Sequence, residues 1–240
     1  MKNQYFGDIN DYHKYGLIRQ LTGSGRIRTA VCWMLTPNIS KYNERRSKYK
    51  YLSRPDKWRH FDFRLYDQLS DLVIGKNIRE VRAVESAGIL PNCRFHSSIL
   101  PDNARKRCLY FQAFSSKVSP ECDLVFFDPD TGLEVGSTPY GQKGSSKYLY
   151  WREVVRFFAF GHSLLIYQHF PRVQRDRFIA QIARELAGHT CVPKVYSFRT
   201  PNVVFLLVPQ TAHRKFFQEK IQVVRSVWRE KIRCQGHAIA

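Results

Sequence analysis

Three acidic side chains follow an apolar run near the middle of the chain, in the segment Leu-Val-Phe-Phe-Asp-Pro-Asp-Thr-Gly-Leu-Glu over residues 124–134. The four apolar residues predict a buried strand that Asp128-Pro129 ends. The like charges of Asp128, Asp130 and Glu134 repel one another, which costs stability. Because ligands of open α/β sheets bind at the carboxyl ends of strands, this segment predicts a chemical site. The alternative is a solvated turn in which Asp and Gly only set the backbone.

A second polar cluster lies near the start of the chain, in Tyr-Phe-Gly-Asp-Ile-Asn-Asp-Tyr-His-Lys-Tyr-Gly over residues 5–16. The amide of Asn10 can both donate to and accept from a base edge, and aromatic rings stack on bases. We therefore expect Asn10 to read a base and Tyr12 or Tyr15 to stack on it. The polar neighbours expected at the same site are Asp8, Asp11 and Lys14. Asn10 or Asp11 could equally cap the helix that follows, and both interpretations can hold together.

A third segment, Ser-Leu-Leu-Ile-Tyr-Gln-His-Phe-Pro-Arg over residues 163–172, carries polar side chains at another strand end. A histidine there can act as an acid, a base or an electrostatic stabiliser. We expect His169 to lie near Asp128, with Arg172 on the sugar-phosphate of a substrate and Gln168 beside them. A purely structural histidine is the alternative. The loop Gly-Gln-Lys-Gly-Ser-Ser-Lys over residues 141–147 could hold a phosphate, although it lacks the spacing of a P-loop.

A basic stretch over residues 37–60 carries eight lysine or arginine residues against two acids, interleaved with three tyrosines and one tryptophan. Cations follow phosphates and aromatic rings stack on exposed bases, so this pattern predicts contact with a nucleic acid. A solvated, charged loop is the alternative. The side chains expected on the nucleic-acid backbone are Arg45, Arg46, Lys48, Lys50, Arg54, Lys57 and Arg59.

The composition points to the same class of partner. The 240 residues include 39 Lys and Arg against 20 Asp and Glu, which gives a net charge of +19. Neutralising phosphates releases counterions, so a chain this basic most often meets nucleic acid. No apolar run approaches the roughly 18 residues of a membrane span, and the first residues lack the apolar core of a signal peptide. We expect a cytoplasmic protein with no membrane and no obligate protein partner. The six cysteines lack zinc spacing, which predicts reduced thiols and no metal.

The elements that must position these side chains alternate along the chain. Helices are predicted over residues 10–21, 61–74, 103–118, 150–160, 171–188 and 212–233. Strands are predicted over residues 29–35, 79–85, 123–128, 163–170, 192–198 and 203–208. This alternation predicts an α/β fold, a single Rossmann-like domain over residues 1–240 with a mainly parallel sheet. Its additions are an antiparallel C-terminal strand pair, the basic insertion loop over 37–60 and a basic C-terminal helix.

The order of these parts resembles that of Rossmann-type methyltransferases, especially the adenine-N6 methyltransferases that act on 23S ribosomal RNA. Residues 7–15, Gly-Asp-x-x-Asp-x-x-Lys-Tyr, are similar to their Gly-Asn-x-x-Asp-x-x-Lys-His pattern. Residues 128–131, Asp-Pro-Asp-Thr, are similar to their catalytic Asp-Pro-Pro-Tyr. The resemblance covers the first 20 residues and the last half of the chain. It implies methyl transfer from S-adenosylmethionine to a base.

Two departures from that family argue against methyl transfer. The turn after the first predicted strand, over residues 33–38, contains no glycine, although close backbone approach to the cofactor needs one. Asp130 and Thr131 stand where an aromatic ring is expected to stack on the flipped base. A second carboxylate is better suited to activating water or to stabilising a cationic transition state.

Hydrolysis of an N-glycosidic bond is therefore our leading hypothesis, since it passes through an oxocarbenium-like state that a carboxylate stabilises while water attacks. The base must first leave the stack. Residues 7–11 resemble the Gly-Ile-Asn-Pro-Gly turn of mismatch-specific uracil-DNA glycosylases. The chain as a whole resembles phage-defence DNA glycosylases of the bacteriophage replication inhibition type. This resemblance implies removal of a modified base, such as glucosylated hydroxymethylcytosine, from phage DNA to leave abasic sites.

In this hypothesis the enzyme acts on double-stranded DNA with a flipped base and uses neither a cofactor nor a metal. The expected catalytic residues are Asp128, Asn10, Asp130 and His169. Three alternatives stay open. The first is a methyltransferase with a divergent cofactor loop, and the second is a nuclease that binds Mg²⁺ through Asp128, Asp130 and Glu134. The third is a DNA-binding protein without enzymatic activity that blocks replication.

Overall fold

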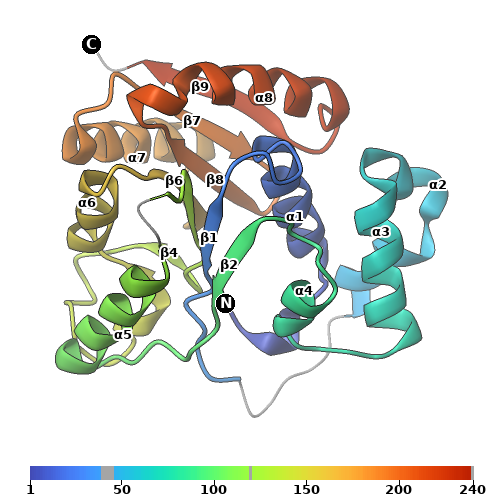
Figure 1. Ribbon diagram of the computed structural model, residues 1–240, viewed down its shortest axis with the longest axis horizontal. Coiled ribbons are helices and arrows are strands. Elements are labelled where there is room, and N and C mark those ends of the chain that lie inside the picture. The colour runs from blue at the N-terminus through green and yellow to red at the C-terminus, as the bar shows by residue number, and fades with distance from the viewer. Residues whose placement is uncertain (39–45, 119–120, 239–240) are drawn as a thin grey trace.

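A seven-stranded sheet in the order β2-β1-β3-β6-β8-β7-β9 forms the centre of the molecule (Figure 1). The computed structural model describes residues 1–38, 46–118 and 121–238. The strands of this sheet are β1 Thr29–Cys32, β2 Cys93–His96, β3 Leu124–Phe127, β6 Ser163–His169, β7 Lys194–Arg199, β8 Val203–Val208 and β9 Arg233–Ala238. A separate short pair joins β4 Gly132–Leu133 to β5 Tyr148–Leu149.

Strand direction divides the sheet into two halves. Neighbours from β2 through β1 and β3 to β6 pair in parallel, whereas β6–β8, β8–β7 and β7–β9 pair antiparallel. The predicted α/β class and the antiparallel pairing of β7 with β8 are therefore confirmed. The sheet is mixed rather than mainly parallel, because β8 inserts between β6 and β7 and β9 extends the edge.

Helices cover both faces of the sheet. The described helices are α1 Ile9–Leu21, α2 Pro55–Trp58, α3 Phe63–Ser70, α4 Arg82–Ser86, α5 Ala104–Lys117, α6 Trp151–Ala159, α7 Arg175–Thr190 and α8 Arg214–Val227, of which α2 and α3 lie to one side of the sheet (Figure 1). Alternate strand residues face two different cores. Val31 and Phe126 pack in the core that contains α1 and α8, whereas Phe127 and Ile166 pack in the core of α5, α6 and α7. Strands that are buried on both faces have unbroken apolar sequences, which is why β3 and β6 could be predicted.

Some sequence predictions of elements are wrong. Residues 79–85 were expected to form a strand, but α4 begins at Arg82. The pattern missed β2, which has only four residues and carries the exposed Arg94 at an edge of the sheet. The helix predicted over 212–233 ends at Val227, and the polar residues after it form β9 because their backbone pairs with β7.

The basic insertion folds into short helical turns in its described part, η2 Arg46–Ser53, α2 and η3 Arg59–Phe61. Tyr49 and Tyr51 are only 8% and 4% exposed. The hydroxyl of Tyr51 donates to the carbonyl of Gly7 at 2.9 Å. These rings therefore attach the insertion to the start of α1 and are not available to stack on bases.

Two other properties concern the chain as a whole. None of the helices in the described ranges is long and apolar enough to cross a membrane. All six cysteines are free, as the sequence predicted, and Cys108 and Cys191 are exposed.

Two buried histidines make stability sensitive to acid. His13 lies in α1 against the rings of Trp58 and Trp228, and His96 ends β2 against Tyr110. Neither imidazole has a hydrogen-bond partner in the described structure. Burial lowers the pKa of each from 6.5 to about 4. Between pH 4 and pH 6.5 the unfolded chain therefore binds more protons than the folded chain. The stability that the two neutral imidazoles contribute is complete above pH 6.5 and is lost as the pH falls towards 4.

We expect the urea midpoint to fall between pH 7 and pH 5, with each histidine contributing at most about 1.4 kcal/mol per pH unit. A variant with both His13→Phe and His96→Phe should lose less stability over the same interval, because phenylalanine fills these aromatic sites without titrating. Urea unfolding followed by circular dichroism at both pH values measures the difference. An equal loss in the variant and in the wild type would contradict this explanation.

Candidate functional site

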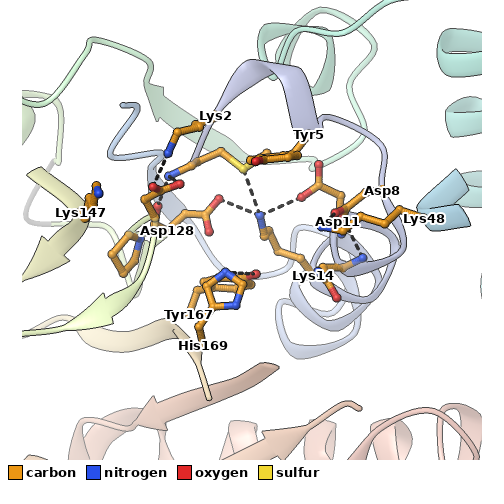
Figure 2. A pocket seen from close by; sticks show the side chains of 14 residues that line it. Lys2, Tyr5, Asp8, Asp11, Lys14, Lys48, Asp128, Lys147, Tyr167 and His169 are labelled. Atoms are coloured by element: carbon orange, nitrogen blue, oxygen red, sulfur yellow. Dashed lines mark hydrogen bonds and ion pairs between the residues drawn. The ribbon is translucent and has the colours of Figure 1, made fainter. Parts of the chain in front are cut away.

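A pocket of about 320 Å³ lies at the carboxyl ends of β3 and β6, where the start of the chain packs against them (Figure 2). Asn10, Asp128 and His169 come from three distant segments, and all three line it, as does Asp130. The sequence prediction that these side chains share a pocket therefore agrees with the geometry. The complete lining is Met1, Lys2, Tyr5, Asp8, Asn10, Asp11, Lys14, Lys48, Asp128, Pro129, Asp130, Lys147, Tyr167 and His169.

Lys14 joins the two acidic segments at the centre of the pocket. Its Nζ lies 2.8 Å from Asp11 Oδ1 and 2.7 Å from Asp128 Oδ2, and none of the three residues is more than 2% exposed. Burial opposes the charge of Lys14, but the two carboxylates outweigh it and raise the lysine pKa. Burial raises the pKa of Asp128, and Lys14 opposes this rise. With both carboxylates ionised, this triad of Asp11, Lys14 and Asp128 holds one net negative charge.

The turn before α1 sets the positions of Asp11 and Lys14. Asp8 caps the helix, because its Oδ1 accepts from the backbone N–H groups of Asn10 at 2.8 Å and Asp11 at 3.1 Å. The cap is therefore Asp8 rather than Asn10 or Asp11. Gly7 has a φ of +76°, and a Cβ there would lie 2.3 Å from Cγ2 of Val73. Asp11 and Lys14 are three residues apart and so share one face of α1.

Asp130 and His169 line the pocket without joining the triad. Asp130 forms an ion pair with Lys2 and lies 3.9 Å from the amino group of Met1. Burial alone would raise the pKa of Asp130, but these two cations outweigh it and lower the pKa. The Nε2 of His169 lies 3.2 Å from the hydroxyl of Tyr167. Burial lowers the pKa of His169 to about 4, so the ring is neutral at pH 7.

Tyr12 and Tyr15, which were expected to stack on a base, are fully buried and do not line the pocket. Tyr12 packs among Tyr51 and other rings, and the hydroxyl of Tyr15 donates to Asp11 Oδ2 at 3.1 Å. Neither ring is accessible to a base in this structure. Tyr5 and Tyr167 are the aromatic side chains at the pocket. Tyr167 could have been found from strand alternation, since residues 167 and 169 share a face of β6.

Gln168 and Arg172 lie elsewhere than predicted. The Oε1 of Gln168 accepts from the backbone N–H of Leu133 at 2.7 Å, and its Nε2 donates to the carbonyl of His169. Gln168 thus holds β4 against β6 and faces away from the pocket. Arg172 is exposed and does not line it.

The cations of the insertion contribute unequally to the pocket. Lys48 lines it and pairs with Asp8 at 3.1 Å. Arg45 and the side chain of Arg46 lie outside what the structure describes. The other four predicted cations do not line the pocket; they are Lys50, Arg54, Lys57 and Arg59. Arg59 pairs with Asp67 instead.

The three carboxylates of the magnesium alternative do not converge. Glu134 lies off the pocket, where its Oε2 accepts from the backbone N–H of Trp151 at 2.7 Å. Asp128 and Asp130 are each bound by a different lysine. Within the described ranges, no group of three or more His, Cys, Asp or Glu could hold a metal ion. The nuclease alternative therefore lacks the ligand set on which it rests.

Met1 occupies a position that the sequence did not reveal. Its amino group donates to the carbonyls of Met34 at 3.3 Å and Asp128 at 3.1 Å. These carbonyls follow β1 and β3, the neighbouring strands at which the order of the sheet reverses. Ligands of open α/β sheets bind at such a switch point. Met34 also has a φ of +45°, so the turn without glycine still enters the left-handed region.

Neither the protein-family models nor the curated proteins compared with this chain match it. The pocket and the order of the strands therefore provide the basis for a function.

The pocket places a buried, negatively charged triad beside lysine side chains at its rim, and the two could contact different parts of a nucleotide. The buried triad can stabilise positive charge that develops in a site with little water. Lysine side chains at the rim can attract phosphate. Tyr5 is half-buried at the pocket, and Lys48 Nζ lies over one face of its ring at 5.0 Å from the centroid, so a planar base would pack against the other face.

Proposed function

We propose that this protein is an S-adenosylmethionine-dependent methyltransferase that acts on a base of a nucleic acid. The observation that carries the proposal is the 2.7 Å contact between Lys14 Nζ and Asp128 Oδ2. These residues lie 114 positions apart and belong to the two motifs that resemble the 23S RNA methyltransferases. Their meeting in one buried triad is what a shared catalytic role for the two motifs requires, and it favours methyl transfer over glycosidic hydrolysis.

The order of the strands supports the same proposal. Asp128 follows β3, the neighbour of β1, and β8 lies antiparallel between β6 and β7. This arrangement resembles the Rossmann-type sheet of the methyltransferases. In such a sheet the switch point between β1 and β3 is the expected ligand site.

The residues present fit this cofactor in two respects. S-adenosylmethionine would supply a methyl group carried on a positively charged sulfur. Within the triad two carboxylates stand against one ammonium group, so Asp11 and Asp128 are the groups that would face that cation. The lining as a whole carries four aspartates, four lysines and the amino group of Met1. The left-handed φ of Met34 shows that the turn after β1 adopts its bend without glycine, which removes part of the objection drawn from the sequence.

The chain's own side chains would orient the base and stabilise its charge. Asp128 would accept a hydrogen bond from an exocyclic amino group and stabilise the positive charge that develops on its nitrogen. The Oδ1 of Asn10 accepts from Asn202 at 3.3 Å, which would leave its NH₂ group to donate to the base edge. Tyr5 would stack on the base, in the role for which residues 130–131 provide no ring.

Label transfer tests the proposal. We expect tritium from S-adenosyl-[methyl-³H]methionine to enter an unmodified 23S RNA transcript or unmethylated duplex DNA. Calorimetry with the cofactor alone should give a dissociation constant in the micromolar range, about −8 kcal/mol of binding free energy. An absence of both binding and labelling would contradict methyl transfer.

A DNA glycosylase is the second candidate, and the position of the first residues favours it. Met1 bridges β1 and β3 through its amino group, and its carbonyl accepts from the backbone N–H of Thr36 at 2.9 Å. A cofactor that enters between these strands requires this segment to move, whereas hydrolysis requires only a base and water. Asp128 would then stabilise the sugar cation. DNA that carries glucosylated hydroxymethylcytosine should acquire alkali-labile sites, and the absence of strand cleavage after alkali would exclude this candidate.

A further inference from the structure

The loop between β4 and β5 has a conformation held by charged groups beneath it. Gly141 and Gly144 have φ angles of +81° and +88°, which side chains rarely adopt. The carboxylate of Asp102 accepts hydrogen bonds from the backbone N–H of Gly144 at 2.8 Å and of Ser146 at 2.7 Å. These bonds lower the pKa of Asp102 although burial opposes them. The loop is therefore fixed by a charged acceptor.

Arg107 of α5 holds the same loop from inside the molecule. It is fully buried and donates to the carbonyls of Ser145 at 3.0 Å and Tyr148 at 2.6 Å. Its Nε also lies 2.6 Å from Glu153 Oε1. A buried guanidinium destabilises a fold unless its donors are satisfied, and here they bind the loop and α6. Such a support suits a loop that must present a side chain at a fixed position.

Lys147 is the side chain that this loop presents to the pocket. Figure 2 shows it on the same side as Lys2 and away from Lys48. Lys2 and Lys48 are each paired with an aspartate. No carboxylate in the described part of the chain pairs with Lys147, which is exposed at the rim. Its ammonium group is therefore available to an anion.

We infer that Lys147 binds a backbone phosphate of the strand whose base enters the pocket. A lysine at the rim reaches a phosphate as a point charge, so this contact does not need the backbone N–H groups of Gly144 and Ser146, which donate to Asp102. The inference rests on the proposed function only in requiring a base in the pocket. It makes the substrate a nucleic-acid strand rather than a free nucleoside, and it assigns to Lys147 a role in binding rather than in chemistry.

The test compares Lys147→Ala with Lys143→Ala, because Lys143 is an exposed lysine of the same loop that does not line the pocket. Fluorescence anisotropy with fluorescein-labelled single-stranded DNA and RNA 20-mers measures binding without turnover. Lys147→Ala should weaken binding about tenfold, the effect of one charge-assisted hydrogen bond. The slope of log K against log salt should become shallower by about 0.7, the value for one phosphate contact on a single strand.

Lys147→Arg should keep the wild-type salt slope, since the charge is retained. Equal losses in Lys147→Ala and Lys143→Ala would indicate a diffuse basic surface and would overturn the assignment. An unchanged salt slope in Lys147→Ala would also overturn it. Because no cofactor or turnover enters the measurement, a protein that binds through Lys147 but transfers no methyl group would refute the proposed function alone.

Discussion

The Asp128→Asn variant should bind nucleic acid as the wild type does and transfer label at least about a hundredfold more slowly, the effect of removing one charge-stabilising group from a preorganised site. Asparagine keeps the volume of Asp128 and can still accept from Lys14. The variant leaves Lys14 paired with Asp11, at 2.8 Å, so that no buried charge loses its partner. The variant should therefore lose reaction rate while its folding stability is kept. The measurement is the single-turnover rate of label transfer.

Asp130→Asn is the matched control, because Asp130 stands two residues away in the same turn and pairs with Lys2 instead of Lys14. We expect it to slow the reaction less than tenfold, within the range for a partly exposed ion pair. Equal losses of rate in the two variants would show that any negative charge at this turn has the same effect on the reaction. The triad would then have no special role. If the reaction is hydrolysis, Asp128→Asn should again lose more activity than Asp130→Asn when abasic sites are counted.

The strand ends of the site could be predicted from the sequence, because each follows a local apolar run. Asp128 and His169 lie where their runs end, and parallel strands bring such ends to one edge of the sheet. The expectation that Asn10 joins them came from hydrogen-bonding chemistry and agrees with the pocket. The ion pair between Lys14 and Asp128 could not be predicted, since it depends on how α1 packs across the sheet.

The burial of α1 explains why the predicted stacking residues are inaccessible. A helix was predicted over residues 10–21, and α1 is buried on almost all sides, including His13 and Lys14. Gly16 shows how close the packing is, because a Cβ there would lie 2.3 Å from Cζ2 of Trp228 in the segment after α8. Lys14 is held in this helix by Asp11 on the same face and by Asp128, which lies 114 positions away. No local pattern reveals this distant partner, and the same holds for Asp130, the partner of Lys2.

Replacing Lys14 with methionine should lower the free energy of unfolding by about 3–5 kcal/mol at pH 7, the cost of removing one partner from buried charges. Asp11 and Asp128 would stay at no more than 2% exposure without the lysine. Burial would then raise the pKa of Asp128 without opposition from Lys14. The folded chain would bind more protons than the unfolded chain, so the loss relative to the wild type should shrink as the pH falls from 7 to 5. Urea unfolding at both pH values measures this difference.

A neutral version of the triad separates charge from packing. The triple variant Asp11→Asn, Lys14→Met and Asp128→Asn keeps similar volumes and leaves no buried charge at this position. We expect it to recover most of the stability lost in Lys14→Met, because a neutral replacement of a buried ion pair is often tolerated. It should remain inactive, since the negative charge that the proposed reaction needs is absent. A triple variant as unstable as Lys14→Met would show that the lysine stem stabilises the fold by packing, and active triple protein would show that the triad serves stability alone.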